Sequence, residues 1–184
     1  MSIVLLALVA LGVLIGVGVV VFYNRLVGQR NAIADAWSGI DVQLTRRADL
    51  VPNLVAVVKA YQVHERDTLE AVTSARAAAR AAKGPAEAGE AERVFEGSVT
   101  SLLAVSEAYP DLKADESFRQ LQTELTTLEE DISFARRYYN AVVRKFNTTQ
   151  QTFPIVLLAR PLGFREAEYF QADRDAKSVP DARL

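Results

Sequence analysis

The sequence predicts a mainly α protein, in which a single N-terminal transmembrane helix continues into an antiparallel bundle of three or four long helices. Three observations support this prediction. The N-terminal region contains a long apolar run without a charged residue. The sequence after it repeats apolar residues at intervals of three and four, which is typical of amphipathic helices. No segment alternates apolar and polar residues between turn signals, as half-buried strands would.

The apolar run extends from Ile3 to Phe22 and reads IVLLALVALGVLIGVGVVVF. A helix of this length spans about 30 Å, the thickness of the hydrocarbon core of a bilayer. A signal peptide would have a basic n-region, a shorter apolar region and a small-residue cleavage site. The run is longer than such an apolar region, and it has neither a basic n-region before it nor a cleavage site of this kind after it. These features predict an uncleaved anchor. Tyr23 and Arg25 then fall at the membrane interface, where aromatic and basic residues are enriched.

The distribution of basic residues predicts the orientation of the anchor. Arg25 and Arg30 follow the run, whereas only the terminal amine precedes it. The positive-inside rule therefore places the C-terminal part in the cytoplasm. Within the run, Gly12 and Gly16 form a G-x-x-x-G pair, whose spacing allows two helices to approach closely. The alternative is a plain anchor with flexible glycines.

A heptad-like seam continues after the anchor and passes through Pro52. A proline inside a helix removes a backbone hydrogen bond and usually kinks or breaks the helix. The phase of the seam does not change there, which favours one continuous or gently kinked helix. The alternative is a short break with Asp49 as N-cap, since proline is tolerated in a first turn. The seam consists of Ile33, Trp37, Ile40, Leu44, Arg47, Val51, Leu54, Val58 and Tyr61.

Two further seams follow, separated by proline-containing breaks. The breaks are predicted from Lys83 to Gly89 and at Pro110. Asp115, or Ser117 with Gln120, is the candidate cap before the last long helix. The 3.5-residue repeat predicts coiled-coil-like packing at roughly +20°. The seams are Ala91, Phe95, Ser98, Leu102, Val105 and Tyr109, and then Phe118, Leu121, Leu125, Leu128, Ile132, Ala135, Tyr139, Val142 and Phe146.

The C-terminal region divides into an apolar segment and a polar tail. The segment from Phe153 to Phe170 is interrupted by Pro154, Pro161 and Gly163, so it is too short and too broken to span a membrane. It either caps the bundle end or lies on a lipid or partner surface. The tail has almost nothing apolar and is predicted to be disordered. The chain therefore divides into an anchor (1–22), a helical-bundle domain (23–170) and the tail (171–184).

The candidate interaction or register residues on or beside the first seam are Trp37, Arg46, Arg47, Pro52 and Glu65. Arg47 takes a core position, and Glu65 takes another further on. A buried charge must pair or extend its head to solvent, because an unpaired buried charge is costly. Arg47 is therefore either partly exposed near a kink or bundle edge, or held in a polar contact, within the bundle or between subunits, that sets the register of the helices. Candidate partners for Arg46 or Arg47 are Glu124, Glu129 and Asp131. Trp37 lies about 22 Å beyond Phe22 along a continuing helix, too far for the membrane interface, and is predicted to anchor the bundle.

Residue types that carry catalysis or bind cofactors are scarce. The chain has one histidine and no cysteine, so a zinc site of the usual nitrogen and sulfur type is not available. His64 and Glu65 begin an H-E-x-x-H pattern that Thr68 interrupts. No nucleophile elbow or glycine-rich phosphate loop occurs. The net charge is −2 and the sequence shows no basic patch. Both observations argue against nucleic acid as a partner. We therefore expect neither an enzyme nor a cofactor.

Several long motifs resemble the LemA family. YNRLVGQRNAIADAWSGIDVQLTRRADLVPNLVAVVKAYQVHE, from Tyr23 to Glu65, is similar to the family's central signature. EAYPDL, ARRYYNAVVRKFN and the block from Phe153 to Phe170 are similar to its later blocks, in the same order. The resemblance covers most of the chain. It implies a bacterial-type protein with an N-terminal anchor, a short external N-terminus and a cytoplasmic α-helical domain, and it implies no reaction. One branch of the family is associated with magnetosome membranes.

These features together predict a single-pass protein of the bacterial inner membrane that acts as a self-assembling scaffold. Its expected partners are the lipid bilayer and further copies of itself. The alternative is a sensor or adaptor that binds a partner protein or small ligand and signals through the first long helix.

Overall fold

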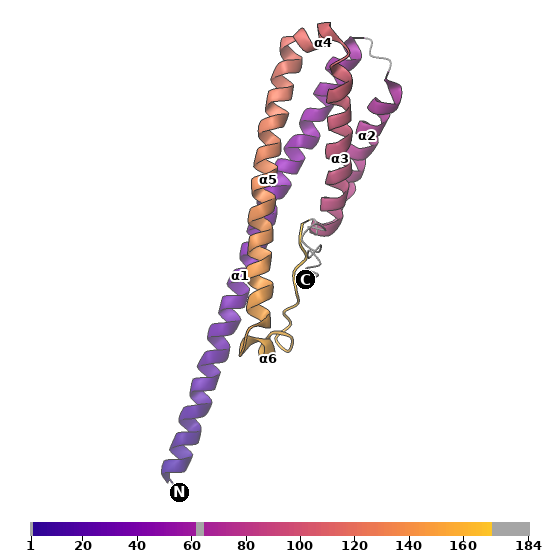
Figure 1. Ribbon diagram of the computed structural model, residues 1–184. Coiled ribbons are helices and arrows are strands. Elements are labelled where there is room, and N and C mark those ends of the chain that lie inside the picture. Colours follow the sequence, from indigo (N-terminus) through magenta and orange to yellow (C-terminus); the bar gives the residue numbers. More distant parts are fainter. Residues whose placement is uncertain (1, 62–64, 171–184) are drawn as a thin grey trace, which may run out of the picture. The chain divides into compact units, whose positions relative to one another are not determined.

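The computed structural model describes residues 2–61 and 65–170 (Figure 1). No strand occurs within these ranges, so the prediction of a mainly α protein is confirmed. His64 and the tail at 171–184, which is predicted to be disordered, lie outside the described residues. The helices are α1 (Ser2–Ala60), α2 (Arg66–Ala81), α3 (Gly84–Ser106), α4 (Pro110–Ala114), α5 (Glu116–Gln151) and α6 (Ile155–Ala159).

The described residues form two compact units, and α1 and α5 contribute to both of them. The first unit contains residues 2–36 and 138–167. The second unit contains residues 37–61, 65–137 and 168–170. The N-terminal stretch of α1 in the first unit is long and apolar enough to cross a membrane, and none of its most apolar window is buried. It therefore fits a membrane anchor, as predicted.

The core of the first unit forms where α6 and the turn after it fold back onto α1 and the end of α5. Its buried members are Leu26, Phe146, Ile155, Ala159 and Phe164. The segment from Phe153 thus caps this unit, which was one of the two predicted alternatives.

A glycine turn brings Phe164 into that core. Gly163 has a φ of +81°, a conformation that costs other residues about 1–2 kcal/mol. The amide of Gly163 donates to the carbonyl of Arg160, and the amide of Phe164 donates to that of Ala159 at 2.9 Å. This is the Schellman arrangement, in which a left-handed residue ends the helix and the following apolar residue packs back onto it.

Polar side chains near the end of α5 hold the extended segment that follows the turn. The Asn147 side chain donates to the carbonyl of Ala167 at 3.0 Å and accepts from the amide of Ala167 at 2.9 Å. Gln150 donates to the carbonyl of Arg165 at 3.3 Å. Both side chains are buried, so these bonds give their amide groups the partners that buried polar groups require.

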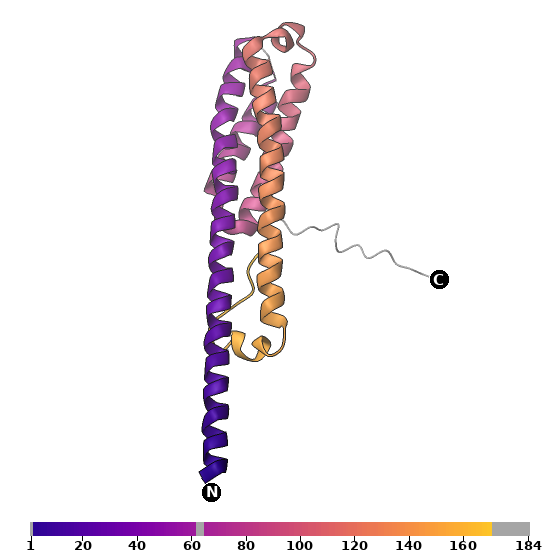
Figure 2. The same cartoon turned by 90° about the vertical axis from the view of Figure 1, so that its left-hand side faces the viewer.

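The core of the second unit gathers one apolar face from each of its helices. In Figure 2 the C-terminal half of α1 runs beside α5, with α2 and α3 behind them. The first seam is confirmed along most of its length, since its positions from Ile40 to Val58 are buried. The core consists of Ala48, Val51, Leu54, Val58, Leu69, Val72, Ala75, Phe95, Val99, Leu102, Leu112, Phe118 and Leu125.

Two predictions about α3 are wrong in detail. The break predicted from Lys83 to Gly89 is limited to Ala82 and Lys83, because Pro85 lies in the first turn of α3, where its missing amide costs nothing. The predicted seam shares only Phe95 and Leu102 with the observed buried face. That face consists of Ala88, Gly89, Glu92, Phe95, Val99, Leu102 and Ser106.

Helix α1 continues through Pro52, so the alternative of a break with Asp49 as N-cap is wrong. A proline at this position has no N–H to donate to the carbonyl of Ala48, four residues earlier. The structure supplies another donor, because Nε of Arg76 on α2 donates to that carbonyl. The Arg76 side chain is 30% exposed. The hydrogen bond that proline removes from α1 is thus replaced by one that ties α2 to α1.

The start of α5 is capped by Asp115, one of the two predicted caps. Its carboxylate accepts from the amide of Phe118 at 2.9 Å and from the hydroxyl of Tyr61 at 2.7 Å. The hydrogen bond from Tyr61, followed by that from the Phe118 amide, holds the pKa of Asp115 below its usual value. Ser117, the other candidate, lies inside α5.

The bond between Arg76 and the Ala48 carbonyl predicts energetic coupling between Arg76 and Pro52. Replacing Arg76 with Met leaves the carbonyl without a donor and is expected to lower the free energy of unfolding by about 1–3 kcal/mol. In a Pro52→Ala background the restored N–H takes over, so the same change is expected to cost much less. Chemical unfolding of the four proteins of this double-mutant cycle measures the coupling.

The matched control is Arg80→Met, which removes an exposed α2 arginine paired with Asp49 at 2.8 Å. It is expected to cost under about 1 kcal/mol in either background. Equal costs of Arg76→Met with and without Pro52 would contradict the assignment.

Candidate functional site

The candidate functional site is built around Arg47, on the buried face of α1 in the second unit. Leu44, Arg47, Val51 and Leu54 follow one another on that face at helical spacing, so the guanidinium points where an apolar side chain would normally pack. Arg47 is only 3% exposed. The alternative of a partly exposed arginine at a bundle edge is therefore wrong.

Two carboxylates from different helices pair with this arginine. Glu92 on α3 and Glu129 on α5 each accept a hydrogen bond from one terminal nitrogen of Arg47. The guanidinium carbon also lies 5.5 Å from the ring centre of Phe95, within the range of a cation–π contact. Arg47, Glu92 and Glu129, the Arg47 cluster, thus tie α3 and α5 to α1. The predicted partner Glu129 is one of the two observed, and the contact lies within one chain.

The Arg47 cluster carries one positive charge for two carboxylates. The Glu92 side chain is 7% exposed and that of Glu129 is 38% exposed, so Glu92 bears most of the cost of burial. Burial raises the pKa of Glu92 and the pairing with Arg47 opposes the shift, while the charges of Glu129 and Glu96 add to it. Because like charges near a carboxylate disfavour its ionised form, the cluster favours uptake of a proton or another cation.

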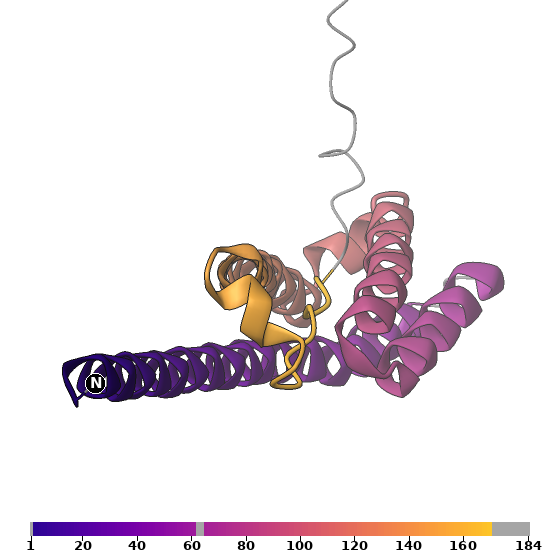
Figure 3. The same cartoon turned by 90° about the horizontal axis from the view of Figure 1, so that it is seen from below.

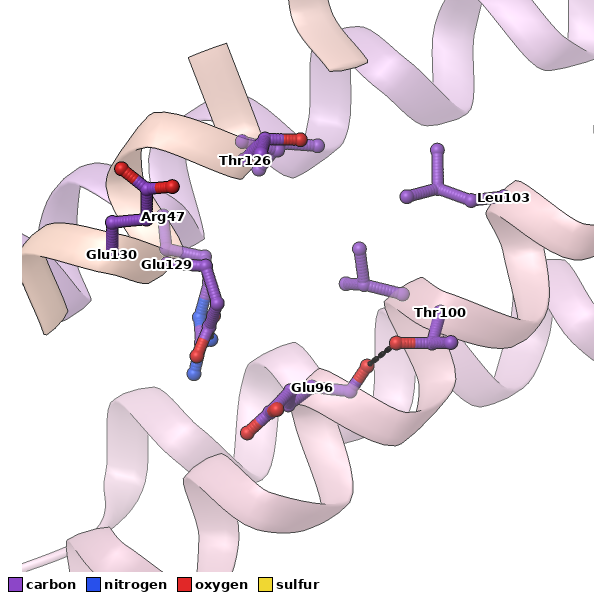
Figure 4. A pocket seen from close by; sticks show the side chains of 9 residues that line it. Arg47, Glu96, Thr100, Leu103, Thr126, Glu129 and Glu130 are labelled. Carbon is purple, nitrogen blue, oxygen red and sulfur yellow. Dashed lines mark hydrogen bonds and ion pairs between the residues drawn. The ribbon is translucent and has the colours of Figure 1, made fainter. Parts of the chain in front are cut away.

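An apolar-walled cavity of about 310 Å³ opens beside the cluster. Figure 4 shows Glu96, Thr100 and Leu103 on α3 facing Thr126 and Glu129 on α5. The volume is at the lower end of the range for small-molecule sites. Its apolar wall and its three glutamates, with Glu130 as the third, suit a ligand that has an apolar body and a positive head. Nε of Arg47 is buried and has no hydrogen-bond partner within the described residues.

The other predicted residues are not brought to this site. Arg46 is exposed. Glu65 is exposed just before α2, and its predicted core position is wrong because α1 ends at Ala60 and its seam stops there. Of the other candidate partners, Glu124 instead accepts from Gln120 at 3.0 Å, and Asp131 is exposed.

The remaining predicted residues lie elsewhere on α1. Trp37 is half-buried, with its ring centre 6.1 Å from that of Phe170, which agrees with a role in packing. Pro52 is exposed on α1. Tyr23 contacts Phe164 edge to face, with ring centres 5.6 Å apart. Arg25, Gly12 and Gly16 are exposed.

Sequence reasoning missed Glu92 and Arg76. The predicted seam of α3 differs by one residue from the observed buried face at several positions. It placed Ala91 in the core instead of Glu92, because an apolar residue is a better core candidate than a carboxylate. An unpaired arginine on the first seam was the available signal, since a buried positive charge requires a carboxylate partner on a helix that faces it. Arg76 had a comparable signal, because Pro52 inside a continuous helix requires a donor for the carbonyl of Ala48.

The model of the LemA family matches residues 36–183, which include the whole Arg47 cluster. The chain belongs to the LemA family. Protein LemA of Metamycoplasma hominis is 27% identical over 150 residues, which cover 81% of this chain and 68% of that protein.

Magnetosome proteins are also similar to this member of the LemA family. Magnetosome protein MamQ 2 of Paramagnetospirillum magneticum is 33% identical over 86 residues, or 47% of this chain. Magnetosome protein MamQ of Magnetospirillum gryphiswaldense is 28% identical over the same length. The matched region spans 31% of each of these relatives, about a third of their length.

The burial of Arg47 predicts a large effect on stability. Arg47→Ala leaves Glu92 buried without its cation and is expected to lower the free energy of unfolding by about 3–5 kcal/mol. Arg46→Ala, which removes the exposed neighbouring arginine, is expected to change it by no more than about 0.5 kcal/mol. Chemical denaturation of the two full-length variants in the same detergent measures the difference. Equal stability of the two variants would contradict the structural role of the cluster.

The raised pKa of Glu92 predicts a pH dependence of stability with a definite sign. The folded state holds the Glu92 proton more tightly than the unfolded state, so this group favours folding most below its ordinary pKa of 4.5. That contribution is lost as the pH rises from 4.5 through the raised folded pKa. The free energy of unfolding of the wild type, minus that of Glu92→Gln, should therefore fall across this range. A difference that grows with pH would show that Arg47 outweighs burial and lowers the pKa.

Proposed function

We propose that this LemA family member is a membrane-anchored, non-enzymatic helical-bundle protein that acts as a self-assembling scaffold or membrane-organising protein. The observation that carries the proposal is the continuity of α1. One helix of 59 residues contains both an apolar stretch that the other described residues leave uncovered and the buried face that holds the Arg47 cluster. The magnetosome proteins among the relatives are consistent with a role at membranes.

The proposed location is the bacterial inner membrane, which α1 crosses once, with the C-terminal domain in the cytoplasm. Arg25 and Arg30 follow the apolar stretch and support this orientation. We propose the lipid bilayer and further copies of this chain as partners, and no nucleic acid.

Self-association through the anchor is proposed at Gly12 and Gly16. A Cβ added to either glycine would meet no atom of the described residues within 4 Å, so this surface is open in the part of the chain that the structure describes. Small residues four apart let two helices approach closely in a membrane. In an assembly that uses these two glycines, the anchor helices would therefore pack directly against one another.

The detergent-solubilised full-length protein is expected to be a homo-oligomer, and Gly12→Ile with Gly16→Ile is expected to lower its mass. Gly18→Ile adds the same bulk to another face of the helix and should leave the mass unchanged. Light scattering over a range of protein concentrations measures these masses. A monomer at every concentration would contradict the scaffold, and an unaltered oligomer in the double variant would contradict the role of the glycine pair.

The cavity beside the Arg47 cluster favours a second candidate function, that of a sensor or adaptor. We infer that such an adaptor would bind a cationic, partly apolar segment of a partner protein, or a small ligand of the same chemistry. The glutamates would hold the positive group, and Val99, Leu103 and Leu125 would contact the apolar part. Glu129 lines the cavity and accepts a hydrogen bond from Arg47 of α1, so a ligand that bound Glu129 would alter a contact of α1.

A fluorescent peptide of alternating leucine and lysine tests the adaptor with the full-length protein in nanodiscs. Leu103→Lys places a positive charge in the cavity and is expected to weaken binding at least tenfold. The control, Ser101→Lys, adds the same charge to α3 outside the cavity, at an exposed position. Fluorescence anisotropy that gave equal affinities for the two variants would contradict binding in the cavity.

A further inference from the structure

We propose that α6 and the residues just before it form a second membrane contact, which rests in the interfacial region of a bilayer that contains anionic lipids. This contact, the α6 foot, consists of residues 153–160. It is separate from the transmembrane stretch of α1 and lies wholly within the first unit. The inference requires α1 to be a membrane anchor but does not depend on scaffolding or on the Arg47 cluster.

The position of the α6 foot along α1 places it close to the end of the membrane anchor. The apolar run ends at Phe22, and the next residue, Tyr23, contacts Phe164 in the turn after α6. Leu26, one turn beyond Phe22, packs in the same core as Ile155 and Ala159. In Figure 3 α6 lies at the near end of α5, beside a stretch of α1 well away from the N-terminus. The α6 foot therefore lies within about one helical turn, or 5–6 Å, of the end of the anchor.

The outward face of the α6 foot is apolar. Ile155 and Ala159 point into the core, whereas Phe153 is 76% exposed, Leu157 is 65% exposed and Val156 is 46% exposed. Three large apolar side chains within five residues form an exposed patch of the kind that marks a membrane or protein contact. An apolar face of this kind inserts about 5–10 Å into the boundary between headgroups and acyl chains.

The charge of the first unit favours anionic lipid. The whole chain has a net charge of −2, but residues 1–36 and 138–167 contain six basic and only two acidic residues. Basic residues near a membrane surface attract anionic headgroups. One acidic residue, Glu166, accepts a hydrogen bond from Gln151 at 2.9 Å. The basic residues are Arg25, Arg30, Arg144, Lys145, Arg160 and Arg165.

Continuity with the anchor favours lipid over a second copy of the chain as the occupant. A patch within one turn of the bilayer meets lipid as soon as the anchor is inserted, without any assembly step. Repulsion between two units that each carry an excess of positive charge would oppose close packing of this face against itself.

The test uses the absence of native cysteine, which allows a nitroxide to be placed at single positions of the full-length protein. Spin labels at Phe153→Cys and Leu157→Cys are examined in nanodiscs that hold one protein each, made of phosphatidylcholine and phosphatidylglycerol. Collision with oxygen, which concentrates in lipid, is compared with collision with a water-soluble nickel complex. Leu8→Cys, in the apolar run, is the bilayer reference. Ala141→Cys, exposed on α5 within the same unit, is the aqueous reference.

If the α6 foot rests in the bilayer, the ratio of oxygen to nickel collisions at positions 153 and 157 will be at least several times the ratio at position 141. The depth calculated for both labels will be shallower than that of the label at position 8. Nickel collisions equal to those at 141 would overturn the proposal. Protection from both reagents would also overturn it, because another protein surface would then cover the patch. In nanodiscs of phosphatidylcholine alone the depth at 157 should decrease, and an unchanged depth would contradict the role of anionic lipid. Lipid-like values at position 8 with aqueous values at 157 would refute the α6 foot while leaving the anchor and the proposed scaffold intact.

Discussion

The second unit depends on one buried guanidinium. Arg47 reaches from α1 to a carboxylate on α3 and another on α5, so the three helices share one electrostatic contact. A buried ion pair adds little net stability compared with well-packed apolar residues, because desolvation offsets most of the attraction, but breaking it is costly. Its consequence here is selectivity. A helix that slid by one turn would leave Arg47 or Glu92 buried without a partner, whereas apolar neighbours tolerate such a shift more easily.

The cost of burying a polar group without a partner also explains the other long-range contacts. Pro52 deprives the Ala48 carbonyl of its donor, and Arg76 of α2 supplies one. In the first unit, Asn147 pairs with both backbone groups of Ala167, and Gln29 donates to Thr149 at 3.1 Å. Each unit thus combines an apolar core, which drives the helices together, with a few directional bonds that select one arrangement.

The helices could be predicted from the sequence wherever an apolar repeat or a helix-breaking residue gave a clear local signal. The apolar run, the first seam through Pro52 and the Asp115 cap all follow from local rules. The phase of α3 could not be predicted in this way, because Phe95 and Leu102 are shared by two neighbouring faces and the choice between Ala91 and Glu92 depends on Arg47, 45 residues away. Arg47 itself was recognisable as a misplaced charge, and Glu129 as one of its candidate partners. Arg76 and Glu92 required knowledge of which helices face each other, which spacing along one helix does not contain.

Hydrogen–deuterium exchange tests the central claim most directly, because it reports the stability of each helix separately. Full-length Arg47→Ala and Arg46→Ala proteins in nanodiscs would be compared peptide by peptide. If the Arg47 cluster ties the helices of the second unit, Arg47→Ala will speed exchange in α3 around Glu92 and in α5 around Glu129. Peptides of the first unit around Phe146 and Phe164 will be unaffected, and Arg46→Ala will resemble the wild type. Unchanged exchange in α3 and α5 of Arg47→Ala would contradict the account.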